Sequence, residues 1–315
     1  MVAVADHGRF AAAARALGVT QPALSLGIKR LEMELGTRLF DRARGRVEPT
    51  AAGAAALRVA RRLLGDGDEL RREVSMLQGL RTGTLTVVAG TYAAEMSGYR
   101  ALGRLARKNP GLRCRLDLRE WNRSTDPLLT READLALAEV TAVDSEPLLV
   151  AETLNIQPGR FFCRPGHPVL ALSRPNLRQI SAYPWAWVPM PPRIFRAFGR
   201  TQPAAGYLDK RHHQFVPALR VETLAGIKQV VRESDAISAA PPRLIADEVR
   251  AGTLAVIEFA PPWLRLNYGF IYLRDRTLSP AARAFMAEVR AVEAEYVHVP
   301  ANRRPVRRAA GVEAP

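Results

Sequence analysis

The side chains that could contact a nucleic acid fall into two stretches of the first fifty residues. The first stretch carries an amide, hydroxyls and an amine at the start of an expected helix, and it comprises Thr20, Gln21, Pro22, Ser25, Leu26 and Lys29. Gln and Ser can hydrogen-bond to base edges, Lys can reach a base or a phosphate, and Leu can touch a thymine methyl. The second stretch places three arginines around Gly45, which suits a hairpin over phosphates or in a minor groove: Arg42, Arg44 and Arg46.

Two short helices joined by a tight turn would position the first stretch. Apolar residues recur at helical spacing from Phe10 to Leu17, and Gly18 then suits a helix end. Thr20 is a candidate N-cap for a second helix that runs to about residue 35, with an apolar stripe of Leu24, Ile28, Leu31 and Leu35. This order is typical of a helix-turn-helix unit, whose second helix reads base edges. The alternative is a small helical domain with a solvated basic loop.

The residues from Gly8 to Ser25 resemble the winged helix-turn-helix of LysR-type transcriptional regulators. Further segments that resemble this family are Ile28–Glu32, Glu34–Gly36, Leu39–Arg42 and Thr50–Gly53. The last of these resembles the start of the family's linker helix. The resemblance implies a DNA-binding domain over residues 1–50 and a double-stranded operator as partner. It also implies that Gln21, Pro22, Ser25 and the wing arginines contact that DNA.

Two features depart from the family pattern. Leu26 stands where the family commonly has Arg, and Gly27 inside the helix costs about 1 kcal/mol relative to Ala. Residues 1–5 resemble only the end of the family's first helix. We therefore expect either that the first helix is truncated or that the native chain starts upstream of Met1.

Residues 51–80 are expected to form one long linker helix. Its apolar positions alternate steps of four and three residues: Ala56, Ala60, Leu63, Gly67, Leu70, Val74 and Leu77. This pattern is the seam of a paired helix and predicts a homodimer, and the family likewise uses this helix to dimerise. The resemblance further implies a homotetramer of two dimers. The alternative is packing against the chain's own core, and Gly65 and Gly67 weaken the centre of the helix.

Strand and helix patterns alternate from residue 80 to 300, which predicts an α/β architecture. The expected strands are 85–89, 112–118, 134–138, 160–163, 186–188, 236–238 and 268–273, and the expected helices are 94–107, 224–232 and 280–294. The resemblance implies two periplasmic-binding-protein-like α/β subdomains, the first at 84–156 with 266–299 and the second at 157–265. The Arg- and Pro-rich tail 300–315 is expected to be disordered.

Five residues are candidates for holding a small-molecule effector between these subdomains. Thr91 and Tyr92 follow an expected strand, and ligands in open α/β sheets bind beyond the carboxyl ends of strands. A helix start at Thr91 suits a carboxylate, so we expect a small anionic organic effector, although Thr91 could equally be a plain N-cap. Trp121 and Asn122 follow the next strand, and Thr223 precedes a helix in the opposite subdomain.

Composition and motifs argue against several other classes of protein. The net charge of +15, from 46 Lys+Arg and 31 Asp+Glu, is consistent with a polyanionic partner. Cys114 and Cys163 cannot form a disulfide framework and no His spacing suits a metal, so we expect a reduced, cytoplasmic chain without metal or cofactor. No stretch approaches the roughly 18 apolar residues of a membrane span. Nucleotide-binding and hydrolase motifs are missing, and the expected DNA-binding unit disfavours the two alternatives, a ligand-processing enzyme and a free-standing solute-binding protein.

Overall fold

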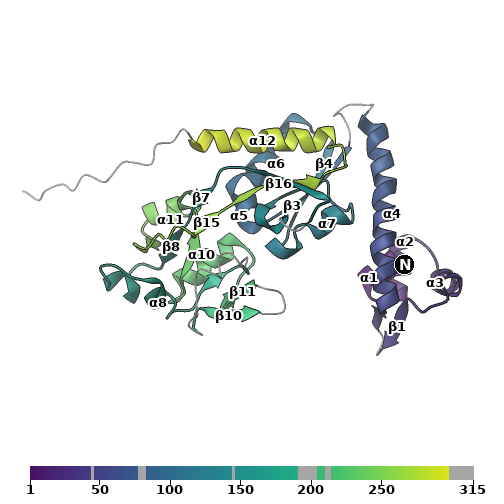
Figure 1. The fold of residues 1–315 in the computed structure, drawn as a ribbon, viewed down its shortest axis with the longest axis horizontal. Coiled ribbons are helices and arrows are strands. Elements are labelled where there is room, and N and C mark those ends of the chain that lie inside the picture. Colours follow the sequence, from purple (N-terminus) through teal and green to yellow (C-terminus); the bar gives the residue numbers. More distant parts are fainter. Residues whose placement is uncertain (44–45, 77–82, 144–145, 191–203, 210–213, 298–315) are drawn as a thin grey trace, which may run out of the picture.

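The computed structural model describes residues 1–43, 46–76, 83–143, 146–190, 204–209 and 214–297. Predictions made above for Arg44, Leu77 and the tail 300–315 lie outside these ranges. Within them, three small helices and the long helix α4 stand beside a larger α/β half (Figure 1). In the described residues, no helix combines the length and apolar character that crossing a membrane requires.

Three helices and a hairpin form the N-terminal unit: α1 (Val2–His7), α2 (Phe10–Leu17), α3 (Gln21–Leu35), β1 (Phe40–Ala43) and β2 (Arg46–Pro49). Their shared core consists of Val4, Phe10, Ala13, Ile28, Leu39 and Phe40. Gly18 and Gly36 have φ angles of +65° and +66°, so each ends a helix in the left-handed conformation that glycine adopts readily. The predicted pair of helices is confirmed. One residue of the predicted apolar stripe is not buried: Leu35 lies in the last turn of α3 and is 53% exposed.

Helix α4 (Ala51–Met76) is anchored to the N-terminal unit at its first turn. The Thr50 amide donates to the Leu39 carbonyl at 3.0 Å, and the Thr50 hydroxyl donates to the Arg38 carbonyl at 2.8 Å. Gly53 lies so close to Leu39 that an added Cβ would overlap the Leu39 carbonyl oxygen. Farther along, α4 exposes three large apolar side chains, those of Val59, Leu63 and Leu64. The helix is therefore fixed at its start and has an unburied apolar face beyond it.

A five-stranded sheet in the order β4-β3-β5-β16-β6 organises what we call subdomain 1. Its strands are β3 (Gly83–Ala89), β4 (Leu112–Leu118), β5 (Leu135–Glu139), β6 (Leu149–Thr153) and β16 (Tyr268–Leu273). Strand β3 pairs in parallel with β4 and β5, whereas β16 is antiparallel to β5 and β6. The helices are α5 (Thr91–Ala93), η1 (Ala94–Gly98), α6 (Tyr99–Lys108), η2 (Trp121–Arg123), α7 (Asp126–Leu129), η3 (Val140–Val143) and α12 (Pro280–Val297).

The second lobe, subdomain 2, contains the elements from β7 to β15. Its strands are β7 (Gln157–Pro158), β8 (Arg160–Cys163), β9 (Ala186–Trp187), β10 (Gly206–Asp209), β11 (Gln214–Pro217), β12 (Leu219–Arg220), β13 (Ser238–Ala240), β14 (Ala255–Val256) and β15 (Arg265–Leu266). Its helices are η4 (Pro168–Ala171), α8 (Leu177–Ile180), α10 (Leu224–Arg232), η5 (Pro242–Leu244) and α11 (Ala246–Arg250). Strand β8 lies between β13 and β14, over a core that includes Phe161, Trp185, Trp187 and Phe215. The chain leaves subdomain 1 at β7 and returns at β15, and these two strands pair.

Several boundaries differ from the sequence predictions by one to three residues, and three of them have a visible local cause or pairing. The helix predicted from residue 94 begins at Thr91, because the Ala94 amide already bonds to the Gly90 carbonyl, and it includes a π-helical turn, η1. The strand predicted from Asp134 begins one residue later, since the Asp134 carboxylate accepts a hydrogen bond from the Thr86 amide. The strand predicted at 236–238 is Ser238–Ala240, and Ile237 makes only an isolated bridge to Trp185.

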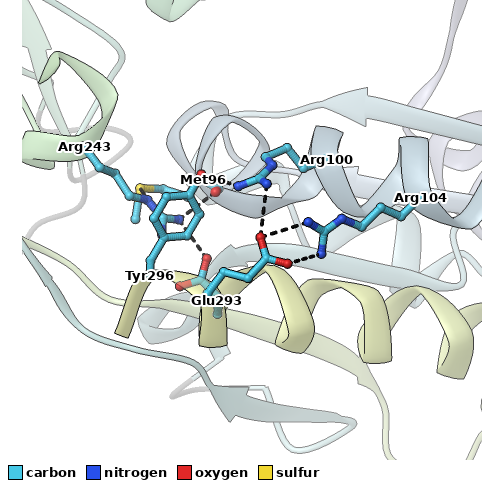
Figure 2. A network of polar contacts seen from close by, with 7 residues as sticks. Met96, Arg100, Arg104, Arg243, Glu293 and Tyr296 are labelled. Carbon is cyan, nitrogen blue, oxygen red and sulfur yellow. Dashed lines mark hydrogen bonds and ion pairs between the residues drawn. The ribbon is translucent and has the colours of Figure 1, made fainter. Parts of the chain in front are cut away.

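A buried polar junction joins the two subdomains on the side of α12 (Figure 2). Arg243 of η5 donates to the Met96 carbonyl at 2.6 Å and to the Glu293 carboxylate at 2.7 Å. Its guanidinium also lies 4.1 Å from the ring centre of Tyr296, a cation–π contact. Alongside, two arginines of α6 contact Glu295 of α12, namely Arg100 and Arg104. Arg243 therefore links subdomain 2 to two helices of subdomain 1.

Candidate DNA-binding surface and ligand cleft

Helix α3 presents the predicted recognition residues on one face. Gln21, Pro22, Leu26 and Lys29 are exposed, and Ser25 is half-buried, while Ile28 on the other side is buried in the core. Thr20 acts as the N-cap, and its hydroxyl oxygen accepts a hydrogen bond from the Ala23 amide at 3.4 Å. The face is thus available at the N-terminal end of the helix, where a recognition helix contacts bases.

The hairpin β1–β2 follows α3 directly and carries the predicted wing. Arg42 lies in β1 opposite Val47, and Arg46 lies in β2 opposite Ala43. The Val47 amide donates to the Gly8 carbonyl at 2.9 Å, which ties the hairpin to the end of α1. Two of the three wing arginines therefore lie on a strand pair held against the helical unit, and the third, Arg44, lies outside the described residues.

A cleft of about 340 Å³ lies between the two subdomains. Subdomain 1 contributes residues at the carboxyl ends of its parallel strands, including Gly90, Leu118 and Glu139, as the sequence predicted for an open α/β sheet. Subdomain 2 supplies an apolar wall with Trp187 and Met190. The volume is at the lower end of the range typical of small-molecule sites.

Three of the five predicted effector residues line this cleft: Thr91, Tyr92 and Trp121. The Thr91 hydroxyl donates across the cleft to the Glu222 carbonyl at 2.9 Å, and the Tyr92 hydroxyl donates to the Ala239 carbonyl at 3.1 Å. Burial raises the pKa of the Tyr92 phenol above its ordinary value, so the group remains a neutral donor. Both residues therefore touch both subdomains.

The other two predicted residues are placed differently. Thr223 is not among the described lining residues, and its hydroxyl oxygen accepts from the Gly226 amide at 3.1 Å as the N-cap of α10. The local cap, rather than the cleft, thus determines how this side chain is oriented. Asn122 lies in η2 beside Trp121, and its side chain is outside the described part of the structure.

The cleft is mainly apolar, with arginines from both subdomains around it. Arg119 and Arg123 follow β4, while Arg220 and Arg265 come from β12 and β15. Arg220 forms ion pairs with Glu120 and, at 3.9 Å, with Glu222. Neither these arginines nor the apolar surface at Trp187 was predicted from the sequence. They lie far apart in sequence, so only the fold brings them together.

Metal chemistry has no obvious location in the described residues. No group of three or more His, Cys, Asp or Glu side chains is arranged there to hold an ion. Cys114 and Cys163 are both free thiols, and burial raises the pKa of each above its ordinary value. Neither thiol is thereby activated as a nucleophile.

A winged helix-turn-helix joined by one long helix to two α/β lobes around a cleft defines the class of ligand-responsive transcription regulators. Comparison with known families supports this class over most of the chain. Residues 1–54 match the family described as bacterial regulatory helix-turn-helix protein, lysR family, and residues 78–294 match the LysR substrate binding domain. The chain belongs to the LysR family of transcriptional regulators and is not an enzyme. The fold class predicted from the sequence is confirmed.

Full-length relatives share this organisation. The SDS degradation transcriptional activation protein of a Pseudomonas species is 40% identical over 288 residues, which cover 90% of this chain and 91% of that protein. Among solved structures, ArgP from Mycobacterium tuberculosis aligns with a TM-score of 0.62 at 19% identity, over 93% of this chain and 94% of that one. LysG from Corynebacterium glutamicum, solved with bound effector Arg, aligns with a TM-score of 0.53 at 18% identity, over 93% and 95%. This family comprises bacterial regulatory helix-turn-helix proteins, and LysG is a solved structure of this fold with an effector bound.

Proposed function

We propose that this chain is a cytoplasmic, sequence-specific DNA-binding regulator controlled by a small organic anion that binds in the cleft. The strongest support is that the same chain carries an exposed face on α3 and a cleft between two α/β subdomains. The proposed DNA contacts are those predicted from the sequence, on α3 and the wing. The proposed effector contacts are Thr91, Tyr92 and Trp121, and the proposed domain limits are those given above.

We also propose that dimers form through α4 and pair into tetramers. Val59 and Leu63 lie one helical turn apart and are 57% and 66% exposed, and exposed apolar side chains on one face of a helix mark an interaction site. Leu63 belongs to the seam predicted from the sequence. Pairing two such helices would bury side chains that a single chain leaves in water.

DNA binding by the purified protein is expected to depend strongly on salt. The logarithm of the association constant should fall with the logarithm of salt concentration by about 0.9 per phosphate contact, because each contact releases counterions. Duplex fragments enriched from genomic DNA by the protein, and random duplexes as control, provide the probes. Gln21→Ala should reduce the preference for enriched over random fragments, whereas Arg44→Ala should weaken both alike and lower the slope by about one. Equal losses for both variants on both probes would contradict these roles.

The lining of the cleft supports a more specific class of effector, an amphiphilic anion. Trp187, Met190 and Leu264 offer an apolar surface, and the surrounding arginines offer charge-assisted hydrogen bonds to an anionic head. The 40% identical relative is named for SDS degradation, and dodecyl sulfate has this combination of an apolar chain and a single negative charge. Alkyl sulfates are therefore the effector class that we propose.

Dodecyl sulfate is expected to bind at micromolar concentrations, well below those that denature proteins, while methyl sulfate and dodecanol bind at least tenfold more weakly. Each control lacks one half of the amphiphile, either the chain or the charge. Thr91→Val should weaken binding about tenfold, because we propose that the Thr91 hydroxyl, which donates to the Glu222 carbonyl across the cleft, turns to the anion, and a hydrogen bond to a charged group contributes about 1.5–3 kcal/mol. Thr223→Ala, which alters a cap outside the cleft, is the matched control. Calorimetric titration that finds methyl sulfate as tight as dodecyl sulfate would rule out an amphiphile.

A further inference from the structure

One side of α4 packs directly against the turn that follows α7 in subdomain 1. Gly65 is buried there, and an added Cβ would lie 2.5 Å from the Arg131 Cβ and 3.0 Å from the Thr130 carbonyl oxygen. Real side chains do not approach so closely, so any residue other than glycine at 65 must push the turn away. Gly67, two residues farther along α4, has nothing within 4 Å of its Cβ position. The two glycines of the helix centre therefore have different roles.

Ion pairs surround this contact on both sides. Arg131 pairs with Asp66, and Arg61 lies 3.3 Å from Glu132. Arg61 also pairs at 2.5 Å with Asp6 of α1, so one guanidinium touches the N-terminal unit and subdomain 1 together. These side chains are a third to a half exposed, and pairs of that kind contribute little by themselves. The close approach at Gly65 is therefore what makes the contact specific.

The turn after α7 is fixed by packing against the sheet of subdomain 1. Arg131 has a φ angle of +59°, the only left-handed angle of a non-glycine residue in the described part of the chain. On either side of it, Leu128 and Ala133 are buried in a cluster with Val88 of β3 and Ala138 of β5. Strands β3 and β5 end at the cleft. The turn is thus a rigid extension of the sheet whose other end lines the ligand site.

We propose that residues 130–132 form a docking seat for α4 of the same chain. The seat fixes the N-terminal unit relative to the cleft-bearing half. On α4, Arg61 and Gly65 are one helical turn apart, and Val59 and Leu63 lie on the roughly opposite face. Seating in the chain and pairing between chains therefore use different faces of the helix, and both can occur together. Movements of the β3–β5 sheet would reach α4 through this contact.

The test compares Gly65→Ala with Gly67→Ala in the full chain. Both changes raise helix propensity, but only the first places a methyl group against the seat. Position 67 belongs to the predicted pairing seam, in which alanine already occupies positions 56 and 60, so a methyl group there suits the seam. Hydrogen exchange of the backbone at 128–134 should become at least tenfold faster in Gly65→Ala and stay at the wild-type rate in Gly67→Ala. Affinity for duplex fragments enriched from genomic DNA by the wild-type protein should change at least threefold in Gly65→Ala alone.

Each other outcome counts against the proposal. Equal exchange at 128–134 in the two variants would show that α4 does not rest on this turn. Faster exchange in Gly65→Ala with wild-type DNA affinity would show that the seat does not position the DNA-binding unit. A change in DNA affinity that both variants share would assign the effect to helix propensity instead.

Discussion

Replacing Arg243 with alanine is expected to lower the free energy of unfolding by about 3–5 kcal/mol, because it leaves a buried carboxylate without its partner. The side chain of Glu293 is only 4% exposed, and Arg243 is its ion-pair partner at 2.7 Å. The same substitution removes the hydrogen bond to the Met96 carbonyl and the contact with the Tyr296 ring. Denaturant unfolding followed by fluorescence measures the loss.

The matched control is Arg250→Ala, which breaks an ion pair with Asp247 whose side chains are 77% and 88% exposed. An exposed pair contributes about 0–1 kcal/mol, so this variant should remain close to wild type. The double change Arg243→Met with Glu293→Met removes both charges and should recover much of the lost stability. A similar, small loss in Arg243→Ala and Arg250→Ala would mean that the junction is solvated rather than buried.

Gly53→Ala is expected to destabilise the N-terminal unit by about 1–3 kcal/mol and to weaken DNA binding. The new methyl group would overlap the Leu39 carbonyl, whose carbon lies 2.8 Å from the added Cβ. Leu39 belongs to the core of the unit, so the start of α4 must shift or the core must open. Thermal unfolding and DNA affinity would both report this change.

Gly67→Ala provides the comparison for this prediction as well, because it lies in the same helix with no neighbour near its Cβ position. An exposed helical Gly→Ala change stabilises by up to about 1 kcal/mol. The two variants should therefore move the unfolding temperature in opposite directions. If Gly53→Ala behaves like Gly67→Ala, the close approach between α4 and Leu39 does not exist in solution.

Local signals in the sequence were sufficient for much of the fold. The glycines at 18 and 36 and the cap at Thr20 gave the limits of α2 and α3, because each acts on its own neighbouring backbone. Strands β4 and β16 have the predicted bounds. Strand β4 alternates apolar and charged residues between Gly111 and Arg119, and β16 is an apolar run between Asn267 and Arg274. Thr91 could be placed at the cleft because strand ends and ligand sites coincide in open α/β sheets.

Features that depend on contacts between residues far apart in the sequence could not be predicted from local patterns. Thr223 was predicted to hold the effector, but its hydroxyl caps α10, and a helix start alone does not show whether the cleft lies within its reach. Gly65 was read from the sequence only as a weak point of the helix, and the turn at Arg131 is what shows that it is closely packed. The arginines around the cleft come from both subdomains, and no spacing along the chain relates Arg119 to Arg220.

The position of β16 in the sheet affects the order in which the protein can fold during synthesis. This strand lies between β5 and β6 and pairs with both, yet the ribosome makes it after every element of subdomain 2. Until residues 268–273 emerge, β6 has no partner and one edge of β5 is open to water, whereas the aromatic core around Phe161 is already complete. The lobe that comes later in the chain can thus close first, and the nascent earlier lobe carries the exposed strand edges that chaperones protect.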